Sequence, residues 1–215
     1  MQHSAYIKAP LYGLALSLLV SAFTACGGSE GKTGSLDSWK DSAKGSTVTG
    51  EELSVQAGDT LLAPGDYTNF TLSGQVYTEP NATSALLFHT QAGKGGYEVL
   101  FHNGAIDGST KTGSLSHVRN LYRSLATDTA WFDFEMAVRG KNIAVSINGV
   151  DVVCYTEPAQ PYRSADHTDQ LLGRGAFAWV GKSGKTAFKS LHVTVLPADA
   201  TNPNDTLRAI GEQND

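Results

Sequence analysis

The chain has 215 residues, of which 40% are hydrophobic and 17% charged, a balance that excludes a largely disordered protein. Its formal net charge of −5 leaves no basic field and excludes nucleic-acid binding through bulk charge. Two cysteines are too few for a disulfide framework or a thiolate zinc site. We therefore expect one domain with short appendages, and neither a nucleic-acid partner, nor a metal, nor a cofactor.

Residues 1–25 have the pattern of a secretory signal peptide. Lys8 precedes an apolar run, 11–23, that is too short to span a bilayer comfortably. The run ends in Phe23-Thr24-Ala25-Cys26, which resembles the bacterial lipobox and implies cleavage before a Cys26 that carries a diacylglyceryl group. An ordinary cleaved signal with a chance cysteine is the alternative. We expect a lipoprotein of the cell envelope, bound to a membrane through its lipid alone, with a flexible tether over 26–44.

From about residue 45 onward, apolar and polar residues alternate with the period of two that half-buried strands require. Asn148-Gly149 separates two such runs and predicts a hairpin, because both residues tolerate the positive φ of a type I′ turn. The pattern predicts an all-β domain over 45–198, a sandwich of two antiparallel sheets, and then a polar tail over 199–215. The predicted strands are 70–77, 84–90, 96–102, 132–138, 143–147, 150–155, 175–179 and 191–195.

Two long polar stretches, 109–129 and 158–173, interrupt the alternation, and loops on a β scaffold often carry sites. The second stretch contains Asp166, His167 and Asp169, which could together hold a metal. A solvated polar loop is the better explanation of these three residues, so we predict no metal site.

Two other features have structural explanations. The spacing in Gly181–Lys185 is wrong for a phosphate loop, and we predict a hairpin turn. Cys154 lies on a predicted strand with no base nearby, so we expect a small buried hydrophobe rather than a reactive thiol.

Several short segments resemble, in order, motifs of the 3-keto-disaccharide hydrolase family. One of them, Gly96-Tyr97-Glu98-Val99-Leu100, is similar to the family's "G-Y-E-V-Q". The resemblance covers roughly residues 48–197 and implies a concanavalin-like, laminin-G-like jelly-roll sandwich. The matching segments are 66–72, 81–89, 96–100, 112–115, 138–150, 174–179 and 188–193.

The resemblance also implies activity on glycosides oxidised at C3, with release of the aglycone by 1,2-elimination and hydration of the resulting enone. A C3 ketone makes the C2 proton acidic, so one base and one stabiliser of the enolate oxygen could expel the C1 substituent. The chain departs from the family pattern at four positions. His89 stands for an arginine, Leu100 and Val180 for glutamines, and Lys182 for a common histidine.

Glu98 and His102 are the candidate catalytic residues. With Leu100 they share one face of the strand 96–102, since alternate residues point to the same side. Four residues, about 13 Å, separate them, so they could flank a sugar ring, with His102 as the base because histidine side chains titrate near neutrality. A solvated face, on which Glu98 pairs with a cross-strand cation, is the alternative for both.

Five further residues are candidates for substrate binding, and each also has a structural explanation. A histidine can be satisfied in the core or at its rim, an asparagine can occupy a turn, a loop arginine is usually solvated, and a tryptophan can pack in the core. The five are His89, Asn103, Arg119, Trp179 and Lys182.

Three classes of function follow from these observations. The first is a lipid-anchored hydrolase or lyase of 3-keto-glycosides, which works with a separate glycoside-oxidising partner. The second is a non-catalytic, lectin-like sandwich that binds carbohydrate, which the apolar Leu100 and Val180 favour. The third is a structural or adhesion sandwich without a sugar site.

Overall fold

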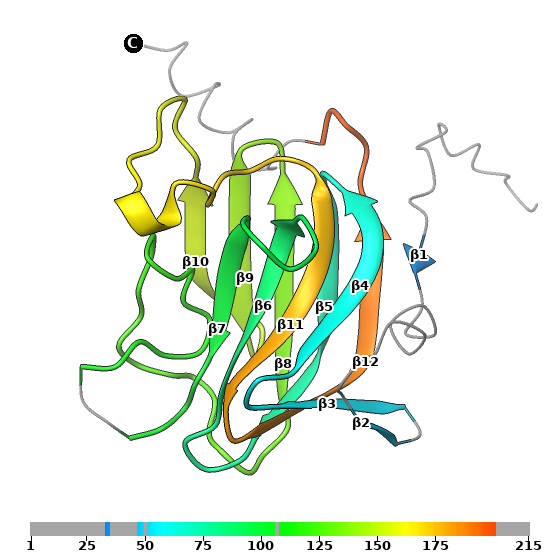
Figure 1. The fold of residues 1–215 in the computed structure, drawn as a ribbon, viewed down its shortest axis with the longest axis vertical. Helices are drawn as coiled ribbons and strands as arrows, with labels where there is room; N and C mark the ends of the chain where they lie inside the picture. Colours follow the sequence, from blue (N-terminus) through cyan, green and yellow to red (C-terminus); the bar gives the residue numbers. More distant parts are fainter. Residues whose placement is uncertain (1–32, 35–46, 50, 106–107, 201–215) are drawn as a thin grey trace, which may run out of the picture. The chain divides into compact units, whose positions relative to one another are not determined.

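Alternating apolar residues build two antiparallel sheets that pack face to face (Figure 1). The computed structural model describes residues 33–34, 47–49, 51–105 and 108–200. The predicted signal peptide, most of the predicted tether and residues 201–215 lie outside them. Within the described ranges the only helical element is a 3₁₀ turn, η1 (Ala165–His167), and no helix has the length and apolar character to cross a membrane.

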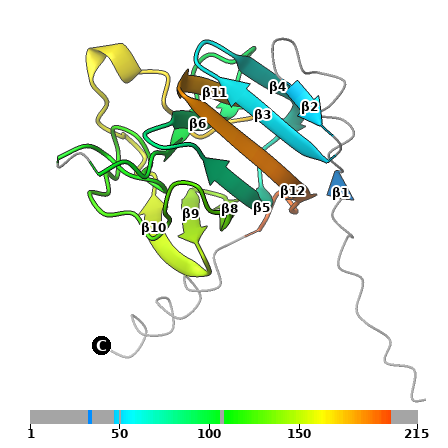
Figure 2. The same ribbon diagram turned by 90° about the horizontal axis from the view of Figure 1, so that it is seen from below.

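The larger sheet has eight strands in the order β10-β9-β8-β5-β12-β3-β2, with β1 also paired to β12. Figure 2 shows β12 between β5 and β3. Its strands are β1 (Thr33–Gly34), β2 (Thr47–Thr49), β3 (Glu52–Gln56), β5 (Phe70–Thr78), β8 (Phe132–Arg139), β9 (Asn142–Ile147), β10 (Val150–Thr156) and β12 (Lys185–Val195).

The smaller sheet has four strands in the order β4-β11-β6-β7. They are β4 (Thr60–Tyr67), β6 (Thr83–Thr90), β7 (Tyr97–Phe101) and β11 (Gly175–Ser183). The core between the sheets is rich in aromatic rings. Trp179 of the smaller sheet lies 3.8 Å, centroid to centroid, from Phe188 of the larger one.

The structure confirms the predicted all-β, concanavalin-like jelly-roll sandwich of two antiparallel sheets. Each predicted strand overlaps an observed one, although the predicted 96–102 is one residue longer than β7 at either end. The Asn148-Gly149 hairpin forms with φ of 50° and 75° at its two residues. The four strands before residue 70, β1 to β4, were not predicted. β12 begins at Lys185, six residues before the predicted start at 191. The prediction missed its first half because a bulge at Ser190 (φ 52°) changes which residues face the core and so breaks the period of two.

Two structural predictions are wrong. The predicted hairpin turn at 181–185 is a turn at Gly184, but not a hairpin, because the two strands it joins, β11 and β12, belong to different sheets. Cys154 lies on β10 as expected, yet its side chain is exposed, because Val153 and Tyr155 take the inward positions on either side of it. Within the predicted tether, β1 pairs with β12.

Candidate functional site

β7 presents polar side chains on the outer face of the smaller sheet. Three residues of β7 are fully buried between the sheets: Tyr97, Val99 and Phe101. The alternation therefore turns Glu98, and also His102 directly after the end of β7, to the outer face, as predicted. The sequence places them there because the inward positions are all large and apolar.

The loop after β7 folds back along this strand and covers its edge. The backbone amide of Leu100 donates to Ser114 O at 2.9 Å, and that of Ser116 donates to Glu98 O at 2.9 Å. An edge strand otherwise leaves such groups unpaired. This pairing brings the polar residues of 109–120 to the outer face of the sheet beside Glu98.

A cavity of about 400 Å³ opens at this place, and we call it the Glu98 pocket. It draws residues from β6, from β7, from β11 and from the covering loop. Its lining consists of Thr83, Glu98, Leu100, His102, Ser109, Thr110, Ser116, His117, Asn120 and Lys182.

Glu98 is held by two donors. Lys182 Nζ, from β11, lies 2.6 Å from Glu98 Oε1, and the Ser116 hydroxyl donates to the same oxygen at 2.8 Å. Both charged side chains keep contact with solvent, since 18% of the Glu98 side chain and 40% of the Lys182 side chain are exposed. The pair places a fixed carboxylate beside an ammonium group at the pocket wall.

His102 is 8% exposed and its ring is oriented by three groups. Its Nδ1 lies 3.3 Å from Ala82 O and 3.1 Å from Thr83 Oγ1. A carbonyl oxygen only accepts, so this contact assigns the proton to Nδ1. Nε2, 3.4 Å from Ser109 Oγ, is then the acceptor nitrogen. Ser109 in turn accepts a hydrogen bond from the buried Lys111 at 2.7 Å.

A second imidazole, His117, stands in the pocket lining against His167 of the other long loop. Their ring centroids are 3.7 Å apart, and Figure 1 shows both long loops beside β7 and β10. Partial loss of solvent around the ring, then the nearby His167 and Lys182, lower the pKa of His117, against the opposing effect of Glu98. The ring is therefore neutral at pH 7 and able to accept a proton.

Of the seven predicted site residues, Glu98, His102 and Lys182 meet in the Glu98 pocket, and the other four lie outside it. The correction is clearest for Trp179, which is 0% exposed. Its ring packs against Phe188 and Phe101, so no face of it is open to a sugar.

The remaining three residues have contacts of a structural kind. His89 is buried, and it joins Thr68 O (3.0 Å) to the amide of Gly173 (3.1 Å). Asn103 holds a turn through hydrogen bonds with Thr78, Thr112 and Ser124. Arg119 is exposed, with its guanidinium carbon 5.1 Å from the centroid of the Tyr155 ring.

His117 and Ser116 belong to the site but had not been singled out from the sequence. Both lie in 109–129, the stretch expected to carry function, yet nothing local separates them from other polar loop residues. Their place depends on the pairing of this loop with β7, which is a tertiary contact.

His167 contacts His117 and Ser164, and the described residues contain no group of three metal-ligand side chains.

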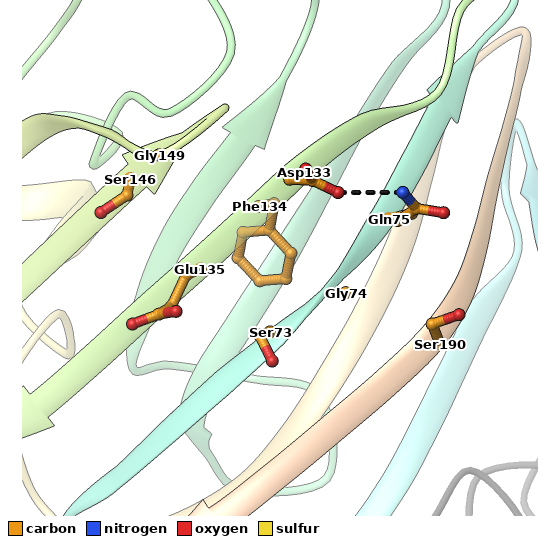
Figure 3. Close-up of a pocket in the computed structure, with 9 residues that line it drawn as sticks. All are labelled: Ser73, Gly74, Gln75, Asp133, Phe134, Glu135, Ser146, Gly149 and Ser190. Atoms are coloured by element: carbon orange, nitrogen blue, oxygen red, sulfur yellow. Dashed lines mark hydrogen bonds between the residues drawn. The ribbon is translucent and has the colours of Figure 1, made fainter.

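A larger cavity, of about 740 Å³, lies on the outer face of the eight-stranded sheet. Figure 3 shows hydroxyl, amide and carboxylate side chains along it, with the Gln75 amide donating to Asp133 at 2.9 Å. Its lining contains no histidine, lysine or arginine. The Glu98 pocket therefore offers more chemistry, because it combines a carboxylate, an ammonium group and two imidazoles.

Comparison with known proteins shows the family and the fold of this chain. The profile of a family described as the 3-keto-alpha-glucoside-1,2-lyase-like domain matches residues 29–194. Among curated proteins, none matches the chain significantly. Two crystal structures of proposed glycosyl hydrolases of Parabacteroides distasonis ATCC 8503 share the fold. The first has a TM-score of 0.64 and 15% sequence identity, and the match covers 72% of this chain and 85% of that chain. The second has a TM-score of 0.63 and 16% sequence identity, and the match covers 77% of this chain and 100% of that chain.

Proposed function

The chain belongs to the 3-keto-alpha-glucoside-1,2-lyase-like domain family, and on this premise we propose that it cleaves glycosides whose C3 hydroxyl has been oxidised to a ketone. A base removes the acidic C2 proton, and the electrons of the C2–H bond form a double bond between C1 and C2. The C1–O bond breaks with its electron pair on the aglycone oxygen, which takes up a proton. Addition of water to the resulting enone completes the net hydrolysis.

The observation that carries this proposal is the convergence of Glu98, His102 and Lys182 on one pocket. His102 Nε2 is the acceptor nitrogen of an oriented ring, which suits it to take the C2 proton. The Lys182 ammonium group is suited to neutralise the charge that develops on the C3 oxygen. Glu98 fixes that ammonium group through the 2.6 Å ion pair.

His117 adds a second function at the pocket wall. Because its pKa is lowered, the ring is neutral at pH 7 and accepts a hydrogen bond from a sugar hydroxyl. A protonated ring would instead compete with Lys182 for the developing negative charge.

The test is incubation of the purified protein with a 3-keto-disaccharide in D₂O. Wild type should release free sugar and exchange the C2 proton for deuterium, both followed by NMR. His102→Gln should lower both rates by about 100-fold or more, the usual contribution of a general base. The matched control is His192→Gln, an exposed histidine on the other sheet, which should match wild type. A wild-type protein that releases no sugar and exchanges no proton overturns the proposal.

A second candidate function, binding of carbohydrate without turnover, is favoured by one residue. Leu100 lines the pocket between Glu98 and His102 and offers no hydrogen bond to a sugar hydroxyl. Titration calorimetry that detects a bound disaccharide, with no product from its 3-keto derivative, would select this candidate over the first.

We also propose that the domain is tethered to the cell envelope through a lipid on Cys26, which lies outside the described residues. The support is the lipobox-like sequence Phe23-Thr24-Ala25-Cys26.

A further inference from the structure

The outer face of the four-stranded sheet is apolar next to the Glu98 pocket. Strand register places Leu100, Ala85 and Val180 in one row across β7, β6 and β11. In the adjoining row Glu98 is followed by Leu87, Ala178 and Leu62. We call the six apolar residues of these two rows the apolar strip: Leu62, Ala85, Leu87, Leu100, Ala178 and Val180.

The opposite side of the sandwich provides an internal comparison. The outer face of the eight-stranded sheet carries Ser73, Gln75, Asp133, Glu135 and Ser146 (Figure 3). Polar residues are the normal covering of a solvent-facing antiparallel sheet. The same chain thus follows the usual pattern on one sheet and departs from it on the other, and contiguous apolar surface outside a core marks a binding site.

The strip reaches both the pocket and the solvent. Leu100 is part of the pocket lining but only 7% exposed, and Ala85 and Ala178 are fully buried. The open part of the strip therefore consists of the half-buried Leu87 and Val180 and of Leu62, which is 36% exposed. The hairpin loop after β6 borders that far end, since a β-carbon at Gly93 would lie 3.4 Å from Leu62 Cδ2. The apolar strip therefore begins beside the ionic groups of the pocket on β7 and ends at Leu62 on β4, where the loop after β6 borders it.

We propose that the open part of the apolar strip, Leu62, Leu87 and Val180, binds the apolar aglycone of a glycoside whose sugar ring occupies the Glu98 pocket. This inference rests on the proposed function, because it assigns the sugar to that pocket. Glu98 and Lys182 can exchange hydrogen bonds with sugar hydroxyls, whereas the side chains of the strip can only pack against carbon. A ligand that is polar at one end and apolar at the other matches both parts, and a disaccharide matches only the first.

The test compares 2-phenylethyl α-glucoside with methyl α-glucoside, whose aglycones are both alcohols, so that the leaving groups are similar. Titration calorimetry gives the two dissociation constants, and turnover of the two 3-keto derivatives is measured separately. We expect the phenylethyl compound to bind at least about tenfold more tightly, the usual effect of filling an apolar subsite. Val180→Gln should reduce this ratio to below about threefold. The matched control is Val150→Gln, a valine that is 53% exposed on the other sheet, and it should keep the wild-type ratio.

The two readouts separate the possible failures. Equal affinity for the two glucosides, or a ratio that Val180→Gln leaves unchanged, overturns the aglycone assignment even if both 3-keto derivatives are consumed. Tighter binding of the phenylethyl compound without turnover of either derivative supports the strip and overturns the lyase proposal. A concentration-dependent dimer in sedimentation that Val180→Gln dissociates would assign the strip to a second copy of the chain and also overturn the inference.

Discussion

A substitution at Glu98 best distinguishes a catalytic surface from a solvated sheet face that has no function. Its carboxylate accepts from Lys182 and Ser116 at the pocket wall, and Gln keeps the shape while removing the charge. We expect Glu98→Gln to lower turnover of a 3-keto-disaccharide by at least about tenfold, because the ammonium group of Lys182 loses its anchor.

Stability should change little in that variant, since a partly exposed ion pair contributes about 0–1 kcal/mol to the free energy of unfolding. The matched control is Glu135→Gln, an exposed glutamate of β8, which should leave turnover unaffected. Equal activity of the two variants would remove Glu98 from the site.

A second glutamate, Glu157, is buried for structural reasons. It is 4% exposed and accepts hydrogen bonds from the Tyr97 hydroxyl at 2.5 Å, the Leu172 amide at 2.8 Å and Lys141 at 3.0 Å. Burial raises the pKa of this carboxyl, but the hydrogen bonds from Tyr97, Leu172 and Lys141 lower it by a larger amount. The pKa therefore lies below its ordinary value. The charged form therefore stabilises the fold.

Removing this charge should be costly. Glu157→Gln leaves Arg163 and Lys141 without their carboxylate, and we expect the free energy of unfolding at pH 7 to fall by about 3 kcal/mol. The stabilising effect of Glu157 is present above the pKa of an unfolded glutamate and is lost as pH falls through the lower folded value. Urea unfolding between pH 7 and pH 3 should thus show the variant and wild type converging in acid. A constant difference across that range would contradict the assignment.

At the scale of elements, the β9–β10 hairpin depends on backbone conformation rather than on space. Gly149 has φ 75°, and a β-carbon there would meet nothing within 4 Å. We expect Gly149→Val to lower the free energy of unfolding by about 1–2 kcal/mol, because a β-branched residue at positive φ is strained. Gly173→Val is the matched control. It also has open space around its β-carbon but no positive φ, and its melting temperature should stay near that of wild type. Equal melting temperatures for both variants would contradict the turn assignment.

Strands whose alternation is unbroken could be predicted from the sequence, and strands with local irregularities could not. β8 and β9 keep one parity throughout, so the period of two reveals their length. In β12 the bulge at Ser190 places Phe188 inward before it, and Leu191 and Val193 inward after it. No single period covers both halves, and only the second half was predicted.

The same distinction explains the candidate site. Glu98 and His102 followed from parity on one strand, which is local information. Lys182 was a candidate through the family resemblance, and a cross-strand cation beside Glu98 was the expected alternative, but that Lys182 is this cation depends on the order of the strands, since it reaches Glu98 across β6. His117 could not be predicted, because it arrives with a loop that pairs with β7. For Trp179 the structural alternative, packing in the core, is the one observed. Alternation places it on the same face as Phe177, but only the packing of the two sheets decides that this face is the core.

The two sheets share one core but present different surfaces. The outer face of the larger sheet is polar around Asp133 and Glu135, as a solvated sheet face normally is. The smaller sheet carries the ionic pocket and the apolar strip, and both long loops gather beside it through the contact between His117 and His167. Among the described residues, Glu98, His102, His117 and Lys182 therefore all lie on one side of the sandwich.

The location of this domain in the cell is the last prediction, and it depends on Cys26. If the lipobox-like sequence directs acylation, wild-type protein expressed with its leader should sediment with membranes, because more than one acyl chain gives stable anchoring. Cys26→Ser should move the protein to the soluble fraction, since no acyl acceptor remains. Cys154→Ser is the matched control, because Cys154 is exposed but lies on β10, far along the chain from the leader, and this variant should sediment as wild type does. A Cys26→Ser protein that stays with the membranes would show that the thiol of Cys26 is not the anchor.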